Sequence, residues 1–272
     1  MEEKIIVTEG DRLQTGPLWN VGGKGLWVNE IERALLSGAI DLAVHSMKDL
    51  PGQITEGLVL AAVPPRADPR DALISRSGAA LADLPLSARV GTTSLRRTCQ
   101  LKAVRQDLDV QILRGNLDTR LRRVDEGTVD AAILACAGLE RLGLASRISE
   151  RLSLAQMLPA VGQGALAIEA RADDEGTQSL CRPLDHEESA IAVSAERSFL
   201  ARLGASCRTP VAAHCILADG QATLSGLVGR PNGSEILVDR VTGASSEAIA
   251  LGAMLADRLL KRGAGAILAI NK

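Results

Sequence analysis

The sequence predicts an α/β protein of two or three domains, the last of them smaller and of α+β type. Three observations carry this prediction. The chain has 272 residues, which is too long for one small core. Strand-like apolar runs alternate with helical segments through the first two thirds, a pattern typical of sheets with helical crossovers. After residue 187, a long helix is followed by closely spaced strands.

The first unit shows apolar runs around a glycine turn. Apolar residues recur at helical spacing after VGGKG (21–25). PPRADPRD (64–71) carries three prolines and predicts a crossing between domains. The elements expected here are a strand near 4–8, a helix at 26–37, a buried strand at 40–46 and an extended piece at 58–63.

Strands and helices alternate closely in the second unit, which predicts a parallel sheet. PAVGQG (159–164) then precedes a returning strand. The elements expected here are strands at 72–75, 89–94, 109–113, 130–135 and 165–170, and helices at 94–104 and 116–126. The last unit is expected to contain helices at 187–203 and 245–261, and strands at 211–217, 222–229, 235–241 and 265–270.

Composition excludes several classes of protein. The chain has no Tyr, one Phe and two Trp, so its core is aliphatic and it lacks the rings that stack on single-stranded nucleic acid. The net charge is −2, so any anion site depends on local arginine clusters. We expect no signal peptide and no membrane span. Five cysteines without CxxC spacing fit a reducing cytoplasm.

The densest polar cluster is GTTSLRRTCQL (91–101). Ser94 is a candidate N-cap, which places Arg96 and Arg97 in the first helical turn. Free backbone N–H groups there, with the hydroxyls of Thr92, Thr93 and Ser94, favour a bound anion. Solvated surface arginines remain the alternative.

A second strand-to-helix turn, ILRGNLDTRLRR (112–123), repeats the pattern. Arg114 sits at a strand end, Asn116 is a candidate cap, and Arg120 follows within the helix. Ligands of open α/β sheets bind outside the carboxyl ends of strands, so both turns face one crevice. Guanidinium groups match carboxylates, which favours a ligand with several carboxylates. A phosphorylated ligand or nucleic acid lacks the support of a Walker loop or dinucleotide fingerprint.

The segment AIDLAVHSMKDLP (39–51) places Lys48 and Asp49 where an apolar strand ends. A carboxylate facing the same crevice can stabilise a cation or handle protons. A surface pair of Lys48 and Asp49, worth little energetically, is equally compatible with the residues. His45 is expected to be a hydrogen-bonded histidine at a strand end.

Cys207 lies in the predicted loop within LGASCRTPVAAHC (203–215), beside Arg208. A thiol near a cation can have a lowered pKa and act as a nucleophile. Cys207, His214 and Cys215 match no common zinc spacing, and no metal is expected. The remaining cysteines are expected to be small apolar fillers in the core.

These segments together resemble the porphobilinogen deaminase family of transferases, also called hydroxymethylbilane synthases, over nearly the whole chain. The likeness rests on VGGKGLWVNEIE, DLAVHSMKDLP, ADPRDALIS, GTTSLRRTCQL, LRGNLDTRLRR, ILACAGLERLG, LPAVGQGALAIEAR and AERSFLARLGASCRTPVA, in the same order. It implies two domains like type II periplasmic binding proteins and a smaller α+β domain. The boundaries expected are 1–65 with 165–183, then 70–160, then 187–272.

The resemblance also implies roles for the site residues. Cys207 would hold a dipyrromethane cofactor through a thioether, and Asp49 would be the catalytic carboxylate. Carboxylates of cofactor and substrate would pair with the cationic and hydroxyl side chains Lys24, Lys48, Thr92, Thr93, Ser94, Arg96, Arg97, Arg114 and Arg120. Trp27 stands at the substrate site in place of the usual Phe, and Asn20 where the family usually has Lys.

The activity implied is the head-to-tail condensation of four porphobilinogen molecules on the cofactor, with loss of ammonia. Water then releases hydroxymethylbilane for tetrapyrrole and haem biosynthesis. A cytoplasmic monomer is expected, with a small-molecule substrate and with neither nucleic acid nor membrane as partner.

One departure from the family concerns its opening strand and helix, which bear an Arg and a Ser. This sequence starts after them. Either its start was assigned too late, which we favour, or the chain is a truncated form with a gap in the first sheet and impaired activity. The alternative function is a non-catalytic two-domain binding protein for a polycarboxylate, which needs the arginines but neither Cys207 nor Asp49. A nucleic-acid binder is a third reading.

Overall fold

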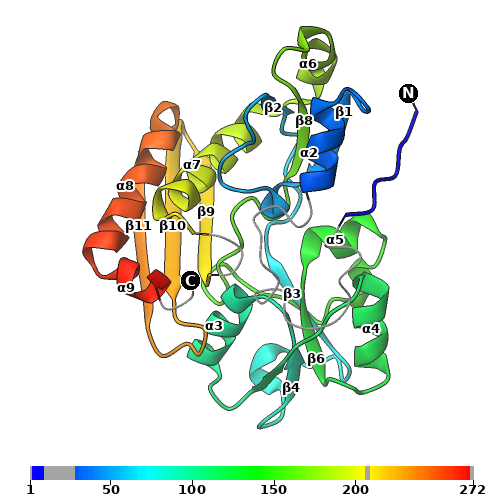
Figure 1. Ribbon diagram of the computed structural model, residues 1–272. Helices are drawn as coiled ribbons and strands as arrows, with labels where there is room; N and C mark the ends of the chain where they lie inside the picture. The colour runs from blue at the N-terminus through cyan, green and yellow to red at the C-terminus, as the bar shows by residue number, and fades with distance from the viewer. Residues whose placement is uncertain (1, 9–27, 206–208, 270–272) are drawn as a thin grey trace.

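The computed structural model describes residues 2–8, 28–205 and 209–269, and it contains three sheets (Figure 1). The first sheet has the order β1-β8-β2, and both of its ladders are antiparallel. Its central strand β8 comes from far along the chain. The strands are β1 (Leu42–Ser46), β2 (Leu58–Ala62) and β8 (Leu166–Arg171). The α/β class predicted from the sequence is confirmed.

Two predictions for this first unit are wrong. The strand at 40–46 was expected to be buried, but β1 alternates, and Val44 is 59% exposed because one face of the sheet edge is open. Residues 4–8 form no strand, and Ile5 is 85% exposed. A strand exists only with a ladder partner, and residues 4–8 belong to none of the sheets formed by the described residues.

The second sheet is mixed rather than parallel. Its order is β5-β4-β6-β3-β7, and β4 runs parallel to β5 and β6, whereas β3 is antiparallel to β6 and β7. The antiparallel β3 enters directly from the proline-rich crossing at 64–71. The strands are β3 (Asp71–Ser75), β4 (Arg89–Gly91), β5 (Asp109–Gln111), β6 (Ala131–Ala135) and β7 (Glu150–Arg151).

Helices predicted from periodicity are confirmed within a few residues, and the shorter ones were not predicted. The predicted helices are α2 (Asn29–Leu36), α3 (Leu95–Val104), α4 (Leu117–Asp125), α7 (Glu187–Leu203) and α8 (Ala248–Lys261). The shorter ones are α5 (Cys136–Arg141), α6 (Glu175–Cys181) and several 3-10 turns. Among the described residues, no helix combines the length and the hydropathy needed to span a membrane.

The third sheet is an antiparallel meander of order β11-β10-β9, covered on one face by α7 and α8 (Figure 1). Its strands are β9 (Val211–Ala218), β10 (Gln221–Gly229) and β11 (Ile236–Ala244). The strand expected at 265–270 is wrong, because residues Ala264–Ala269 form the helix α9. Ile267 and Leu268 pack on the core from this helix, and a short apolar run does not distinguish the two forms.

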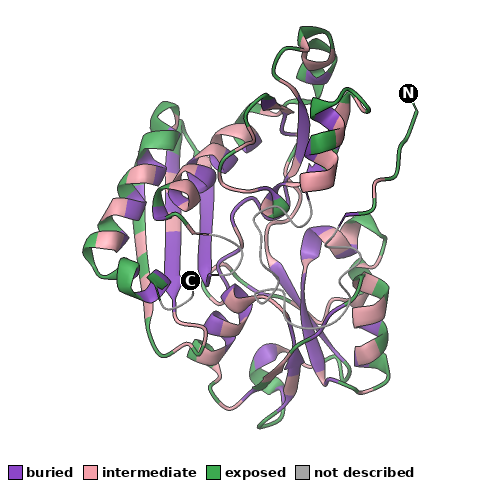
Figure 2. Cartoon of the chain, viewed as in Figure 1, coloured by how far each residue is buried: buried purple, intermediate pink, exposed green. Residues whose placement is uncertain are grey.

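Helix α7 belongs to two hydrophobic cores at once. Phe199 and Ala195 pack against the third sheet, while Val193 packs with Met47 and Leu50 of the first unit. Figure 2 shows buried and partly buried residues along α7, and buried strands in the sheets on either side of it. This shared helix therefore fixes the third unit against the first.

Glu196, a buried carboxylate on α7, binds the two segments that cross between the units, residues 64–71 and 159–164. Glu196 accepts hydrogen bonds from Arg66 Nη1 at 2.7 Å and from the N–H groups of Gly162 at 2.7 Å and Cys215 at 2.9 Å. His214 Nδ1 lies 3.2 Å from the same carboxylate. Burial acts to raise the pKa of Glu196, but Arg66 and His214 outweigh it and lower the pKa to about 2.

Replacement of Glu196 by Gln is expected to lower the free energy of unfolding by about 3–5 kcal/mol, because it leaves the Arg66 charge buried without its partner. Urea denaturation followed by circular dichroism at pH 7 measures this loss. The matched control is Glu56→Gln on the surface, which should change stability by less than about 0.5 kcal/mol. Equal stability of the two variants would contradict the role of Glu196.

Candidate functional site

The candidate site begins where β1 ends. The 3-10 helix η2 (Met47–Asp49) follows β1 directly and carries Lys48 and Asp49. Met47 is buried in the core of the first unit, and its N–H donates to the Ala165 carbonyl at 3.0 Å. The apolar anchor therefore leaves the two charged residues at the rim of that core.

Asp49 combines an accessible side chain with surroundings that are dense in protein. Its side chain is exposed to solvent, yet the protein around it desolvates the carboxyl. Burial raises the pKa of Asp49, while the positive side chains of Lys48 and Arg120 act in the opposite direction. Because Arg120 belongs to α4 of the second unit, Asp49 faces that unit. Asp49 and Arg120 of the second arginine turn therefore lie within electrostatic range of each other, and a crevice shared with both turns stays a prediction.

The first arginine turn is built as the sequence predicted. Ser94 caps α3 by accepting from the Arg97 N–H at 3.4 Å, and the Thr92 hydroxyl accepts from the Ser94 N–H at 3.2 Å. Arg96 and Arg97 are buried, so the reading that they are solvated surface arginines is wrong. Thr93 and Ser94 keep partly accessible side chains at the mouth of this turn.

Asp71 holds both arginines in place, and sequence reasoning missed it. Arg96 Nη1 and Arg97 Nη2 each donate to its carboxylate at 2.7 Å, and Gln163 Nε2 donates at 3.0 Å. Burial acts to raise the pKa of Asp71, but the two guanidinium groups hold it well below its usual value. A signal was present in the sequence: Asp71 opens DALIS, a strand whose neighbours are buried, so the carboxylate needed cations nearby.

The second arginine turn also has the predicted cap. Asn116 Oδ1 accepts from the Thr119 N–H at 2.9 Å at the start of α4. Arg120 Nε donates to the Gly115 carbonyl at 2.8 Å, and Arg114 is buried nearby. Burial lowers the pKa of Arg120 to about 10, and the charges of Arg97 and Arg114 add to this shift.

The two turns and η2 thus place several cations within mutual electrostatic range. Burial lowers the pKa of Lys48, and Arg97 and Arg96 lower it further, while Asp49 and Asp71 oppose the shift. Cations that repel one another in desolvated surroundings are stabilised by an incoming anion. The donor set, guanidinium, ammonium and hydroxyl groups, matches carboxylates. The site is therefore suited to a ligand that carries several carboxylates.

The other candidate residues are readily placed. His45 Nε2 lies 3.1 Å from buried Glu169, as expected for a hydrogen-bonded histidine. The cysteines expected in the core are buried, and burial raises the pKa of Cys99 to about 11 and of Cys215 to about 12. No group of His, Cys, Asp and Glu suited to a metal occurs in the part of the chain that the structure describes. Lys24, Trp27 and Cys207 lie outside the described residues.

Comparison with known proteins decides the family. The family model described as "Porphobilinogen deaminase, dipyromethane cofactor binding domain" matches residues 1–179, and "Porphobilinogen deaminase, C-terminal domain" matches residues 190–261. The chain belongs to the porphobilinogen deaminase family. The resemblance inferred from the sequence motifs is confirmed.

Curated porphobilinogen deaminases align with almost the whole chain. The protein of Syntrophotalea carbinolica is 50% identical over 97% of this chain and 84% of its own length. That of a Roseiflexus species is 51% identical over 97% of this chain and 87% of its own. Among solved structures, an ABC transporter from Parabacteroides distasonis aligns with 87% of this chain and 81% of its own at 14% identity; its TM-score of 0.40 supports no conclusion.

Membership of the porphobilinogen deaminase family makes the chain a transferase of porphyrin biosynthesis with a dipyrromethane cofactor. A dipyrromethane that bears carboxylates fits the described residues, since the cationic cluster of η2, α3 and α4 presents the donors that such groups require. The match of the first family model covers all three of these elements.

Proposed function

We propose that this chain catalyses the stepwise head-to-tail condensation of four porphobilinogen molecules, with loss of ammonia, and the hydrolytic release of hydroxymethylbilane. Family membership supports the reaction. The observation that carries the assignment of the site is the position of Asp49, a solvent-accessible carboxylate surrounded by the cations of two units.

Asp49 is the proposed catalytic residue. Ammonia leaves porphobilinogen more readily if the positive charge that develops on the pyrrole nitrogen faces a carboxylate. Desolvation strengthens this interaction, because charges attract more strongly where protein replaces water. The same desolvation raises the pKa of Asp49, because it makes the ionised carboxylate less stable. A cation that approaches Asp49 stabilises the ionised form again.

The cations around Asp49 are proposed to bind carboxylates. Lys48 and Arg120 lie near Asp49, and we assign them to the acetate and propionate groups of the substrate and the growing chain. Arg96 and Arg97 share one carboxylate, Asp71, so the three groups together keep a net positive charge. Asp71 fixes their orientation and leaves part of their charge for a ligand.

The cofactor is proposed to be attached at Cys207, with Lys48, Thr92, Thr93, Ser94, Arg96, Arg97 and Arg114 holding its carboxylates. When bound, the dipyrromethane supplies the pyrrole carbon to which the first substrate is joined. Lys24 and Trp27 are proposed to contact substrate. We also propose that the protein works as a cytoplasmic monomer, without nucleic acid or membrane as a partner.

Replacement of Asp49 by Asn is expected to lower the rate of porphobilinogen consumption by at least about 100-fold. It should leave stability at pH 7 unchanged or increased. A carboxyl whose pKa is raised on folding stabilises the folded state at low pH, and this contribution is lost as the pH rises through the folded pKa. Urea midpoints at pH 7 and turnover assays measure both effects. A folded variant with near-normal turnover would refute the catalytic role.

The mass of the intact native protein is expected to exceed the sequence mass by that of a dipyrromethane, and Cys207→Ser should remove the excess. Intact-protein mass spectrometry makes the measurement, with the buried cysteine variant Cys99→Ser as the control that retains the adduct. An unmodified native mass would favour a non-catalytic polycarboxylate-binding protein instead.

Replacement of Arg120 by Gln is expected to raise the KM for porphobilinogen about 10-fold to 100-fold, because one charge-assisted hydrogen bond to a carboxylate is lost. Arg122→Gln is the matched control, since Arg122 lies on the same helix and makes only an exposed pair with Glu126 at 3.8 Å. Steady-state kinetics distinguish the two variants. Equal KM values would remove Arg120 from the substrate site.

A further inference from the structure

The segment that carries Asp49 is fixed on one side by the loop at 159–164. Gly162 has a φ of +70°, and a Cβ at this position would collide with Met47 Cγ. The Met47 N–H donates to the Ala165 carbonyl at 3.0 Å. Backbone therefore packs directly against the first residue of η2, and only glycine fits there.

Arg197 of α7 holds the same segment from the other side. Its Nη1 donates to Met47 Sδ at 3.8 Å, and its Nη2 donates to the Gly52 carbonyl at 3.2 Å. These two acceptors lie before and after Lys48 and Asp49 in the chain. Gly52 also approaches the α7 backbone, because a Cβ there would lie 3.4 Å from Ala201 Cα.

Arg197 differs from the other buried arginines in its partners. Arg66 and Arg97 each bind a buried carboxylate at 2.7 Å. Within the described residues, no carboxylate lies within 4.0 Å of Arg197, although it is only 9% exposed. Burial lowers the pKa of Arg197, and Glu169 opposes the shift from farther away. Burial of an arginine without an adjacent carboxylate is unfavourable. The hydrogen bonds that Arg197 donates, which an apolar side chain of similar size cannot make, offset this unfavourable free energy.

The helix α7, which carries Arg197, ends shortly before Cys207 in the sequence. Its neighbour Glu196 fixes α7 to the crossing segments. Gly204, with a φ of +59°, ends α7 three residues before Cys207. One helix thus contacts the segment of the proposed catalytic carboxylate and precedes the proposed attachment residue.

We propose that Arg197 is a positioning residue, which holds η2 against α7 so that Asp49 keeps a fixed place relative to this helix. This inference rests on the proposed function for its effect on turnover, but the contact itself is testable without turnover. Arg197 acts through Met47 and Gly52 and is assigned no contact with the substrate.

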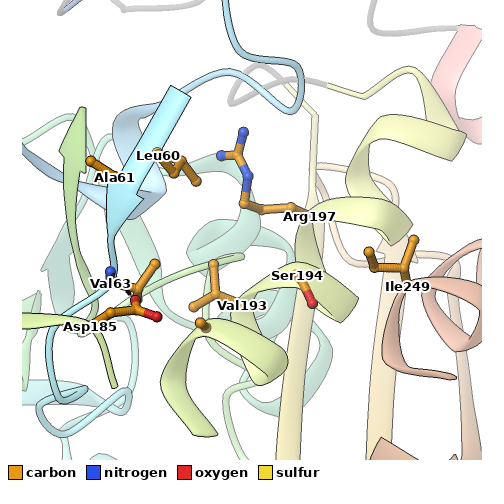
Figure 3. A pocket seen from close by; sticks show the side chains of 9 residues that line it. Leu60, Ala61, Val63, Asp185, Val193, Ser194, Arg197 and Ile249 are labelled. Atoms are coloured by element: carbon orange, nitrogen blue, oxygen red, sulfur yellow. Dashed lines mark hydrogen bonds between the residues drawn. The ribbon is translucent and has the colours of Figure 1, made fainter. Parts of the chain in front are cut away.

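The surroundings of Arg197 allow substitution without a clash. Its side chain borders a cavity of about 370 Å³ between β2, α7 and α8, which Leu60, Val193 and Ile249 also line. Figure 3 shows the side chain extending from α7 toward Leu60, away from Ser194 and Ile249. A methionine at position 197 therefore fits the same space while losing both hydrogen bonds.

The test compares Arg197→Met and Arg197→Lys with the control Arg202→Met, all as cofactor-loaded protein. Arg202 lies on the same helix, and its Nε pairs with Asp257 within the third unit at 2.7 Å. Hydrogen–deuterium exchange is measured for the peptide spanning residues 46–53. We expect exchange there to rise about 10-fold in Arg197→Met, less in Arg197→Lys, and not at all in Arg202→Met.

Kinetics supply the second measurement. In Arg197→Met, kcat per loaded molecule should fall about 10-fold to 100-fold while KM changes less than about 3-fold, with partial recovery in Arg197→Lys. Unchanged exchange at 46–53, or unchanged kcat in loaded protein, overturns the positioning role. If Arg197→Met fails to fold, hydrogen–deuterium exchange of the peptide 46–53 in Arg197→Lys decides whether Arg197 holds this segment. If the unaltered protein itself shows no turnover, the proposed function fails, while the exchange result still tests the contact.

Discussion

The buried carboxylate of Glu196 is the interaction on which the arrangement of the three sheets depends. It receives N–H donors from both crossing segments, through Arg66 and Gly162, and from β9 through Cys215. Gln163 follows Gly162 in the chain. Its side-chain Nε2 donates to Asp71, and its carbonyl accepts from Arg66 Nε. Two buried acids, Glu196 and Asp71, thus bind the adjacent loop residues Gly162 and Gln163 and join the units. Such desolvated charges tolerate little displacement, so they fix geometry more than they add stability.

The same principle explains how a chain of net charge −2 builds a strongly cationic site. The arginines of the candidate site lie at two strand-to-helix turns, and Asp71 restrains two of them. Desolvation then increases the effect of each remaining charge, as the lowered pKa values of Lys48 and Arg120 indicate. Asp49 lies near these cations, and the proposed function depends on this arrangement of opposite charges. The local field, rather than the total charge of the protein, defines the binding chemistry.

Local sequence predicted what depends on neighbours in the chain. The caps at Ser94 and Asn116, the bounds of α7 and the strand end before Asp49 are all features of this kind. What depends on distant partners could not be predicted. The strand expected near 4–8 needed a ladder that no local pattern shows, and the sheet containing β3 proved to be mixed because its pairing follows the path of the crossing segments. The strand DALIS indicates that Asp71 needs a cation, but its arginine partners lie on α3, and only the fold brings that helix beside β3.

The order of strands in the first sheet has a consequence for how the chain is made. β1 and β2 do not pair with each other; each pairs with β8, whose residues Leu166–Arg171 are synthesised more than 100 residues after β1. All five strands of the second sheet lie between residues 71 and 151, so that unit can close first on the ribosome. Until β8 has been synthesised, β1 and β2 lack the strand with which they pair. Their unpaired backbone groups can then promote aggregation. The surroundings of Asp49, which follows β1 directly, are therefore completed late in the synthesis of the chain.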